Sequence, residues 1–268
     1  MNYRHLRWAG VILLLLMAGC SNQISGMSLD STGQNENEVV DNQGKVKNLQ
    51  YLDDFMRSVD QQEEAKVKVT QYTQEGDPVT TQLHYEKGEV KYRHDTTQDK
   101  YGDQKVIEKS CDSISRLDRA DKTVYIVKCG SEEVDILNIS YNAGLQDSFD
   151  IQFVYDMENR MSLDTKEKSL SVQADLVSLK KNNFYLTNGE RNRLYKLLIM
   201  ENYFGDKEVT NECRESPEYS LRVVINGNEK HYQWSSCDEG QDVEAMTEMA
   251  ESIAEIIKET KQYKQFFH

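Results

Sequence analysis

Proline, glycine and basic residues are scarce in this sequence, and each scarcity excludes a class of protein. With only 2 Pro and 14 Gly in 268 residues, the chain is neither collagen-like nor proline-rich. The 32 Lys and Arg are outnumbered by 46 Asp and Glu, and the formal charge of −14 argues against a nucleic-acid partner. Hydrophobic residues still make up 38% of the chain, too many for wholesale disorder. We expect an acidic, folded protein with room for about two domains.

Known catalytic motifs are also missing. The sequence contains no Gly-x-Ser-x-Gly, Gly-x-Gly-x-x-Gly, Walker loop or His-Glu-x-x-His. Ser178 and Lys181 match Ser-x-x-Lys, but that motif acts at a helix start with Ser-Asp-Asn and Lys-Thr-Gly, neither of which occurs here. His84, His94 and His231 are isolated from one another. We therefore favour a protein that is not an enzyme and that needs no cofactor and no metal ion.

Two acidic loops keep an alternative open. Glu75–Pro78 and Asp238–Asp242 carry carboxylates that could bind calcium or act as acid and base. Turn chemistry explains the first loop, because Gly and Pro suit a tight turn, and the second suits a loop that ends in a helix cap. The alternative function is a hydrolase with an unrecognised carboxylate site, which would bring Asp77, Asp238 or His94 into a concave pocket with raised carboxyl pKa values.

The first twenty residues combine a basic start, a short apolar run and a cysteine. Arg4 and Arg7 precede the run Val11–Met17, which is about half as long as a membrane-spanning helix. Ala18-Gly19 place small residues directly before Cys20. The pattern resembles the lipobox of bacterial lipoproteins, with Met17 where that motif usually has leucine, and it implies that the cysteine thiol receives a diacylglycerol. The other possibility is an uncleaved membrane anchor with an incidental cysteine.

The lipobox resemblance implies a location. Residues 1–19 would be a signal peptide, and Cys20 would become the lipidated N-terminus, with palmitate among its acyl chains, on the extracytoplasmic face of a bacterial cell membrane. Residues 20–43 are polar and almost lack periodic apolar positions, which predicts a flexible tether. We expect the protein to contact the membrane through this N-terminal lipid.

Four cysteines remain beyond the proposed lipid site, and an even number in an exported protein indicates disulfides. Three pairings are possible. We favour Cys111 with Cys129 and Cys213 with Cys237, because each pair closes a short loop within one predicted domain, worth about 3 kcal/mol in the chain-entropy model. A four-cysteine zinc site is the alternative, but the sequence has no Cys-x-x-Cys.

Residues 44–142 are predicted to form a first α+β domain, a helix followed by an antiparallel meander. Asn48 is predicted to cap a helix whose apolar positions between Leu49 and Val59 follow helical spacing. The strand-like runs that follow are 67–72, 79–85, 89–94, 105–114, 123–129 and 134–141.

The register of one hairpin can be predicted. If Lys87-Gly88 forms the loop, Thr81 faces His94 on an apolar face, and the opposite face is polar, with cross-strand ion pairs. His84 and His94 then lie on opposite faces, so they cannot share a metal ion or form an acid–base couple.

The run Thr73-Gln74-Glu75-Gly76-Asp77-Pro78 and several shorter segments recur together in one known family. The other matching positions are 38–41, 44–46, 48–49, 70–72, Tyr92, 99–102, Cys111 and Cys129. Over roughly residues 38–140 the chain resembles the family called domain of unknown function 4362. That family contains small lipoproteins and secreted proteins, mainly Gram-positive, without an assigned activity. The resemblance implies a location and an architecture and no chemistry.

Residues 147–268 are predicted to form a second α+β domain. Thr187 and Glu190 form a capping box for one helix, and Asn226-Gly227 is a hairpin signal between two strands. The last helix is predicted from Asp242 to about Tyr263, with its apolar stripe facing the core. Matching core and cap positions, among them Leu194, Tyr195, Phe204, Tyr219, Leu221, Val223 and Trp234, resemble a module of uncharacterised Gram-positive lipoproteins.

These features predict an α+β protein of two small domains, each an antiparallel sheet packed with one or two helices. Because no catalytic set is present and the sheet faces are broad and contain tyrosine, we predict a non-enzymatic binding module. Its partner would be an envelope protein, a basic ligand or a cell-wall component.

Overall fold

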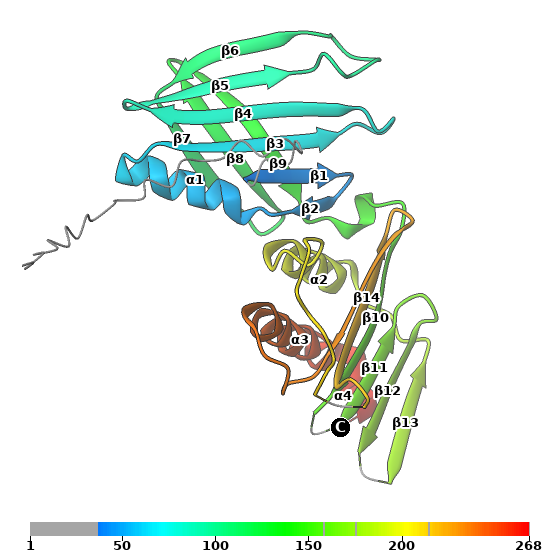
Figure 1. Ribbon diagram of the computed structural model, residues 1–268. Helices are drawn as coiled ribbons and strands as arrows, with labels where there is room; N and C mark the ends of the chain where they lie inside the picture. The colour runs from blue at the N-terminus through cyan, green and yellow to red at the C-terminus, as the bar shows by residue number, and fades with distance from the viewer. Residues whose placement is uncertain (1–36, 158, 175, 214, 268) are drawn as a thin grey trace, which may run out of the picture. The chain divides into compact units, whose positions relative to one another are not determined.

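A six-stranded sheet organises the first half of the chain in the computed structural model, which describes residues 37–157, 159–174, 176–213 and 215–267 (Figure 1). Cys20, the predicted signal peptide and most of the predicted tether lie outside these residues. The strand order is β2-β1-β3-β4-β5-β6, and β1 pairs in parallel with β3 whereas the other neighbours are antiparallel. The strands are β1 (Glu38–Asn42), β2 (Lys45–Lys47), β3 (Ala65–Tyr72), β4 (Pro78–Glu86), β5 (Glu89–Asp95) and β6 (Val106–Cys111).

The predicted end of the tether at residue 43 is wrong, because β1 begins at Glu38. Val39 is fully buried, and the turn at Gln43-Gly44 returns the chain along β2. A single buried valine in a polar stretch is a weak periodic signal. The neighbouring strand β3, which lies more than twenty residues later, is what buries it.

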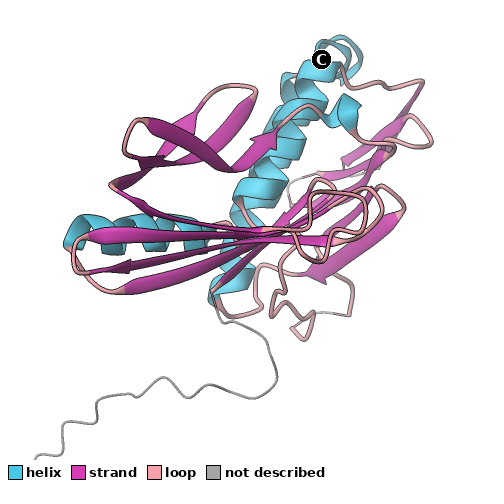
Figure 2. Cartoon of the chain, turned by 90° about the horizontal axis from the view of Figure 1, so that it is seen from above, coloured by secondary structure: helices cyan, strands magenta, loops and turns pink. Residues whose placement is uncertain are grey.

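Helix α1 (Gln50–Gln61) lies alongside this sheet and contacts β1 and β3 (Figures 1 and 2). The helix buries its own residues Leu52 and Phe55, as the helical spacing predicts. The prediction that Asn48 caps this helix is wrong. The N-cap is Leu49, without a side-chain hydrogen bond, and Asn48 has a left-handed backbone from which its side chain donates to the Glu38 carbonyl.

A three-stranded antiparallel sheet, β7-β8-β9, completes the first half. Its strands are β7 (Ser113–Asp118), β8 (Lys122–Cys129) and β9 (Glu132–Ser140), and β7 and β8 contact β5 and β6 of the first sheet. The predicted continuous strand 105–114 is therefore wrong. The chain leaves the first sheet at Asp112, whose carboxylate accepts the Gly130 N–H, and enters the second.

The predicted register of the β4–β5 hairpin is confirmed. Thr81 pairs with His94, and the two loop residues, Lys87 and Gly88, have positive φ angles of 52° and 85°. Primed turns of this kind match the right-handed twist of paired strands. Leu83 is buried, whereas Gln82 points to the opposite, exposed face.

The second half of the chain contains a six-stranded antiparallel sheet of order β13-β12-β11-β10-β14-β15. The 3-10 turn Ala143–Leu145 leads into it. Trp234 is fully buried, stacks on Tyr219 and donates its indole N–H to Thr247 of helix α3 at 3.0 Å. The strands are β10 (Phe149–Asp156), β11 (Arg160–Asp164), β12 (Ser169–Ala174), β13 (Val177–Asn182), β14 (Tyr219–Ile225) and β15 (Asn228–Trp234).

Three helices accompany this sheet: α2 (Asn188–Met200), α3 (Gln241–Glu259) and α4 (Lys261–Phe267). The capping box of Thr187 and Glu190 is confirmed at the start of α2. The single predicted last helix is instead two, interrupted at Thr260, and the first of them begins at Gln241, one residue before the predicted start. The apolar stripe of α3 is buried, as predicted.

Hydrogen bonds join the two halves, which belong to one compact unit. Tyr195 of α2 donates its hydroxyl to the Gly44 carbonyl at 2.6 Å, and the Asn48 N–H donates to Asn202 at 2.6 Å. Asn226, at the tip of the β14–β15 hairpin, donates to the Gln43 carbonyl at 2.8 Å. The fold is α+β, as predicted, with mostly antiparallel sheets and helices packed against them. The division into domains at residues 142 and 147 stays a prediction.

Candidate functional site

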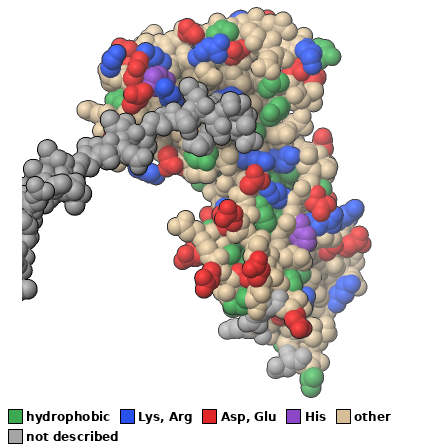
Figure 3. Space-filling view, in the orientation of Figure 1, with side chains coloured by type: hydrophobic (Ala, Val, Ile, Leu, Met, Phe, Trp, Pro, Cys, Tyr) green, Lys and Arg blue, Asp and Glu red, His purple; other side chains and the backbone are tan. Residues whose placement is uncertain are grey.

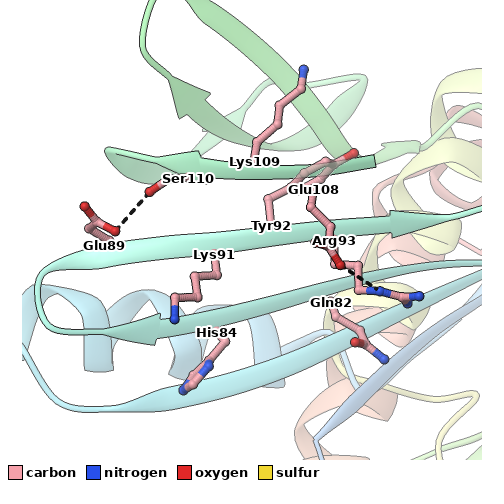
Figure 4. A pocket seen from close by; sticks show the side chains of 9 residues that line it. All are labelled: Gln82, His84, Glu89, Lys91, Tyr92, Arg93, Glu108, Lys109 and Ser110. Carbon is pink, nitrogen blue, oxygen red and sulfur yellow. Dashed lines mark hydrogen bonds and ion pairs between the residues drawn. The ribbon is translucent and has the colours of Figure 1, made fainter. Parts of the chain in front are cut away.

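The candidate site is the solvent-facing side of β4, β5 and β6. Alternation along paired strands places polar residues there in two rows across β4, β5 and β6. The first row is His84, Lys91 and Ser110, and the second is Gln82, Arg93 and Glu108. Figure 4 shows these side chains together, with Lys109 on the other side of β6. Basic and acidic side chains are mixed over this part of the molecule (Figure 3). We call this surface the outer face.

An open groove of about 510 Å³ runs across the outer face. The groove is open to solvent rather than enclosed, so it suits a surface or a polymer better than an enclosed small molecule. Its lining residues are Gln82, His84, Glu89, Lys91, Tyr92, Arg93, Glu108, Lys109 and Ser110.

The charged groups of the outer face hold one another in place. Arg93 contacts Asp95 at 3.0 Å and Glu108 at 3.3 Å, and Lys91 donates to Glu86. The Lys91 ammonium lowers the pKa of Glu86, and the Glu86 carboxylate raises the pKa of Lys91, so both groups stay ionised at neutral pH. Such a face presents ordered donors and acceptors to a partner, although each exposed pair contributes little to stability.

Residues that carry the family resemblance meet at one end of this sheet. Asp77, in the β3–β4 turn, is buried and accepts both the backbone N–H of Lys100 at 3.1 Å and its ammonium at 2.8 Å. The Lys100 side chain holds the pKa of Asp77 below its usual value. Asp99 accepts the N–H groups of Tyr101 and Gly102, which leaves the Tyr101 ring 80% exposed. The two loops therefore form one ordered rim at this end of the sheet.

The residues of the hydrolase hypothesis are not brought together. Asp77 forms part of the rim, whereas Asp238 accepts the N–H groups of Ser235, Glu212 and Cys213. Burial alone would raise the pKa of Asp238, but these hydrogen bonds lower it on balance. His94 forms a 3.0 Å hydrogen bond with the Thr81 hydroxyl on the core side of the first sheet. Raised carboxyl pKa values, which an acid–base pair needs, occur at neither aspartate.

The remaining sequence candidates are also separate from one another. Ser178 and Lys181 lie on the edge strand β13, and His231 contacts Ser220 on β14 at 2.9 Å. No group of three or more His, Cys, Asp or Glu within the described ranges is placed to hold a metal ion. Over the same ranges, no helix has the length and apolar character of a membrane span.

The four cysteines form the two disulfides that the loop lengths favour. Cys111 ends β6 and bonds to Cys129 at the end of β8, which links the two sheets of the first half. Cys213 bonds to Cys237 in the loops that precede β14 and follow β15. Neither pair is a metal site.

One ionic cluster is not predicted by the sequence. Arg116 of β7 donates to both carboxylate oxygens of Asp53 on α1, at 2.8 and 2.9 Å, and Tyr125 donates to the same carboxylate at 2.8 Å. Tyr125 is fully buried, and burial raises its pKa far above the ordinary value. The cluster fastens α1 to the smaller sheet. Asp53 is separated from its partners by more than sixty residues, so no local sequence motif predicts the cluster.

Comparison with known proteins supports the first-half resemblance. Residues 36–126 match the model of a family described as a domain of unknown function (DUF4362). The match includes both loops of the rim and ends before Cys129. No curated protein and no solved structure is similar to the chain.

Proposed function

We propose that this protein is a lipid-anchored lipoprotein on the extracytoplasmic face of a Gram-positive membrane, where it serves as a non-enzymatic binding module. The lipobox pattern that ends at Cys20 supports the anchor. The two disulfides support export, because such bonds persist in oxidising compartments. The likeness of the second half to a module of Gram-positive lipoproteins is part of this proposal.

The outer face carries the binding proposal. Its polar side chains are already ordered by mutual ion pairs, so a partner need not pay the full entropic cost of immobilising them. The exposed Tyr101 on the rim adds an aromatic contact of the kind that binding surfaces favour. An envelope protein or a cell-wall polymer, both of which present many hydrogen-bonding groups, fits an open groove of this size.

The anchor is tested by replacing Cys20. In the producing bacterium, the wild-type protein is expected in the membrane fraction, with mass spectrometry showing a lipid-modified cysteine. Cys20→Ser should move the protein out of the membrane fraction, whereas the neighbouring Ser21→Ala should not. An unmodified thiol in the wild type would overturn the anchor.

The binding surface is tested by charge reversal. Intact cells are treated with a short cross-linker, and the protein is recovered under denaturing conditions from wild type, Lys91→Glu/Arg93→Glu and a matched control, Lys166→Glu/Lys180→Glu. The outer-face variant should lose a cross-linked species, or co-sedimentation with purified cell wall, that the control keeps. Equal behaviour of the two variants would exclude the outer face.

A further inference from the structure

A second, smaller pocket lies between strand β2 and the β14–β15 hairpin. It has a volume of about 130 Å³ and includes the loop that follows α2. Phe204, only 2% exposed, forms an apolar side of it. A group of basic side chains lies over β2 in the space-filling view (Figure 3). The lining residues are Lys45, Lys47, Phe204, Asn228, Glu229 and Lys230.

The pocket has an excess of positive charge in a strongly acidic protein. Lys45 and Lys47 are two residues apart on one strand, so both point to the same side of β2. Neither has an ion-pair partner within 4.0 Å among the residues that the structure describes. The other charged groups are compensated: Lys230 pairs with Asp206 at 3.0 Å, and Glu229 accepts a 2.6 Å bond from Arg222.

The positive charges of Lys45 and Lys47 also repel each other. Burial, together with the charge of Lys47, lowers the pKa of Lys45. Lys230 chiefly, and Lys47 to a smaller extent, lower the pKa of Asp206. Its side chain is 98% exposed and already bonded to Lys230, so it neutralises the lysine pair of β2 only weakly.

The walls of the pocket are held at a set separation. Asn226, at the hairpin tip, donates to the Gln43 carbonyl and to Gln146, each at 2.8 Å. Tyr195 holds Gly44, the residue directly before Lys45, through a 2.6 Å hydrogen bond. On the other side, the N–H of Asn48, directly after Lys47, donates to Asn202, so the lysines are presented by backbone that is held at both ends, which reduces the cost of ordering a site.

We infer that this pocket binds a phosphate group. A phosphate monoester carries a charge of about −1.5 to −2 at neutral pH, which matches the two uncompensated ammonium groups, whereas a carboxylate would neutralise only one. Compact ammonium groups bind phosphate oxygens as point charges without needing the planar geometry of an arginine fork. The phosphate group could belong to a soluble ion or to a lipid headgroup, since both expose the same oxygens.

Titration calorimetry with the purified full-length protein tests the inference, with inorganic phosphate as the probe in a chloride buffer. Wild type should bind one phosphate saturably at pH 7.5. Lys45→Gln/Lys47→Gln should weaken binding at least tenfold, and the matched control Lys166→Gln/Lys180→Gln should bind as wild type does. Thermal unfolding of each variant establishes that it is folded.

Three further measurements decide the ligand class. Binding should weaken as the pH falls and the phosphate dianion becomes a monoanion. Acetate should compete poorly, and equal competition by acetate would overturn the assignment to phosphate. Vesicles of phosphatidylcholine with and without phosphatidic acid, whose headgroup is a phosphate monoester, distinguish the sources: lysine-dependent binding to the anionic vesicles alone identifies a headgroup, and binding of free phosphate alone identifies a soluble ion. No saturable binding of either, or equal binding by both double variants, would overturn the site.

Discussion

At the scale of single residues, the chemistry of this protein depends on what each ionisable group meets across the fold. Asp53 and Asp54 are neighbours on α1, yet they have different surroundings. Asp54 forms an exposed pair with Arg57 one turn later, whereas Asp53 joins Arg116 and the buried Tyr125. Sequence spacing treats the two aspartates alike, and only the packing of β7 and β8 against α1 distinguishes them.

Replacement of these two aspartates should therefore have unequal effects. Asp53→Ala removes charge-assisted hydrogen bonds and leaves the buried Tyr125 hydroxyl without its acceptor, so we expect the free energy of unfolding to fall by about 2 kcal/mol. Asp54→Ala should cost roughly 0.5 kcal/mol or less, as for exposed pairs on a helix. Urea unfolding of both variants measures the difference. Equal losses would show that the Asp53 cluster adds no more to the free energy of unfolding than an exposed ion pair does.

A second residue-scale prediction concerns pH. Burial chiefly lowers the pKa of His94; Asp95 opposes this effect and Lys105 adds to it. The unfolded chain, with a histidine pKa of about 6.5, therefore binds a proton more readily than the folded protein. His94 supports stability above pH 6.5, and this contribution is lost as the pH falls from 6.5 through the lower folded value.

The measurement is urea unfolding between pH 5 and 8. The wild type should lose stability towards pH 5, and His94→Gln should make the profile flatter. His84→Gln, on the opposite face of the same hairpin, serves as the control and should keep the wild-type slope. A wild-type slope in His94→Gln would show that other groups produce the acid sensitivity.

At the scale of secondary-structure elements, short-range chemistry decides most of what forms. The Asn226-Gly227 loop has φ angles of 49° and 74°, which fits a two-residue primed turn between β14 and β15. Thr187 caps α2 because its hydroxyl accepts the Glu190 N–H within the same turn. Such features involve residues only a few positions apart, so the sequence predicts them well.

Two glycines should respond in opposite directions to alanine. Gly227 has a left-handed backbone, so Gly227→Ala should cost about 1 kcal/mol even though an added Cβ would contact nothing within 4 Å. Gly189 lies in the first turn of α2, where the nearest atom to an added Cβ is 4.0 Å away, so Gly189→Ala should add about 0.5–1 kcal/mol. Thermal unfolding of both variants tests the signs, and a stabilised Gly227→Ala would contradict the turn assignment.

At the scale of the whole molecule, the disulfides and the contacts between halves determine how the elements hold together. The Cys111–Cys129 bond joins two sheets, and the Cys213–Cys237 bond closes the loops around the β14–β15 hairpin. Asp238 accepts the Cys213 N–H and so orders the second of these loops. Its carboxylate therefore stabilises the loops that this disulfide joins.

Removal of either disulfide should weaken the protein by a similar amount. The linked cysteines are 18 and 24 residues apart, for which the chain-entropy model gives about 3 kcal/mol each. We expect this loss in Cys111→Ser/Cys129→Ser and in Cys213→Ser/Cys237→Ser, measured by urea unfolding without reductant. Dithiothreitol breaks both disulfides of the wild type and only the remaining one of each variant. It should therefore lower the free energy of unfolding of the wild type by more than it lowers that of either variant. A variant as stable as the oxidised wild type would show that its bond does not constrain the unfolded chain.

Local patterns predict the α+β class, the β4–β5 register and the capping box, and short loops favour the observed pairing of the cysteines over the other two. The parallel addition of β1 to β3, the change of sheet at Asp112, the Asp53–Arg116 cluster and the approach of Lys45 and Lys47 to Lys230 emerge only in the folded chain. These features join residues from about twenty to more than 180 positions apart. Their geometry follows from how whole elements pack, and no local interaction energy specifies it.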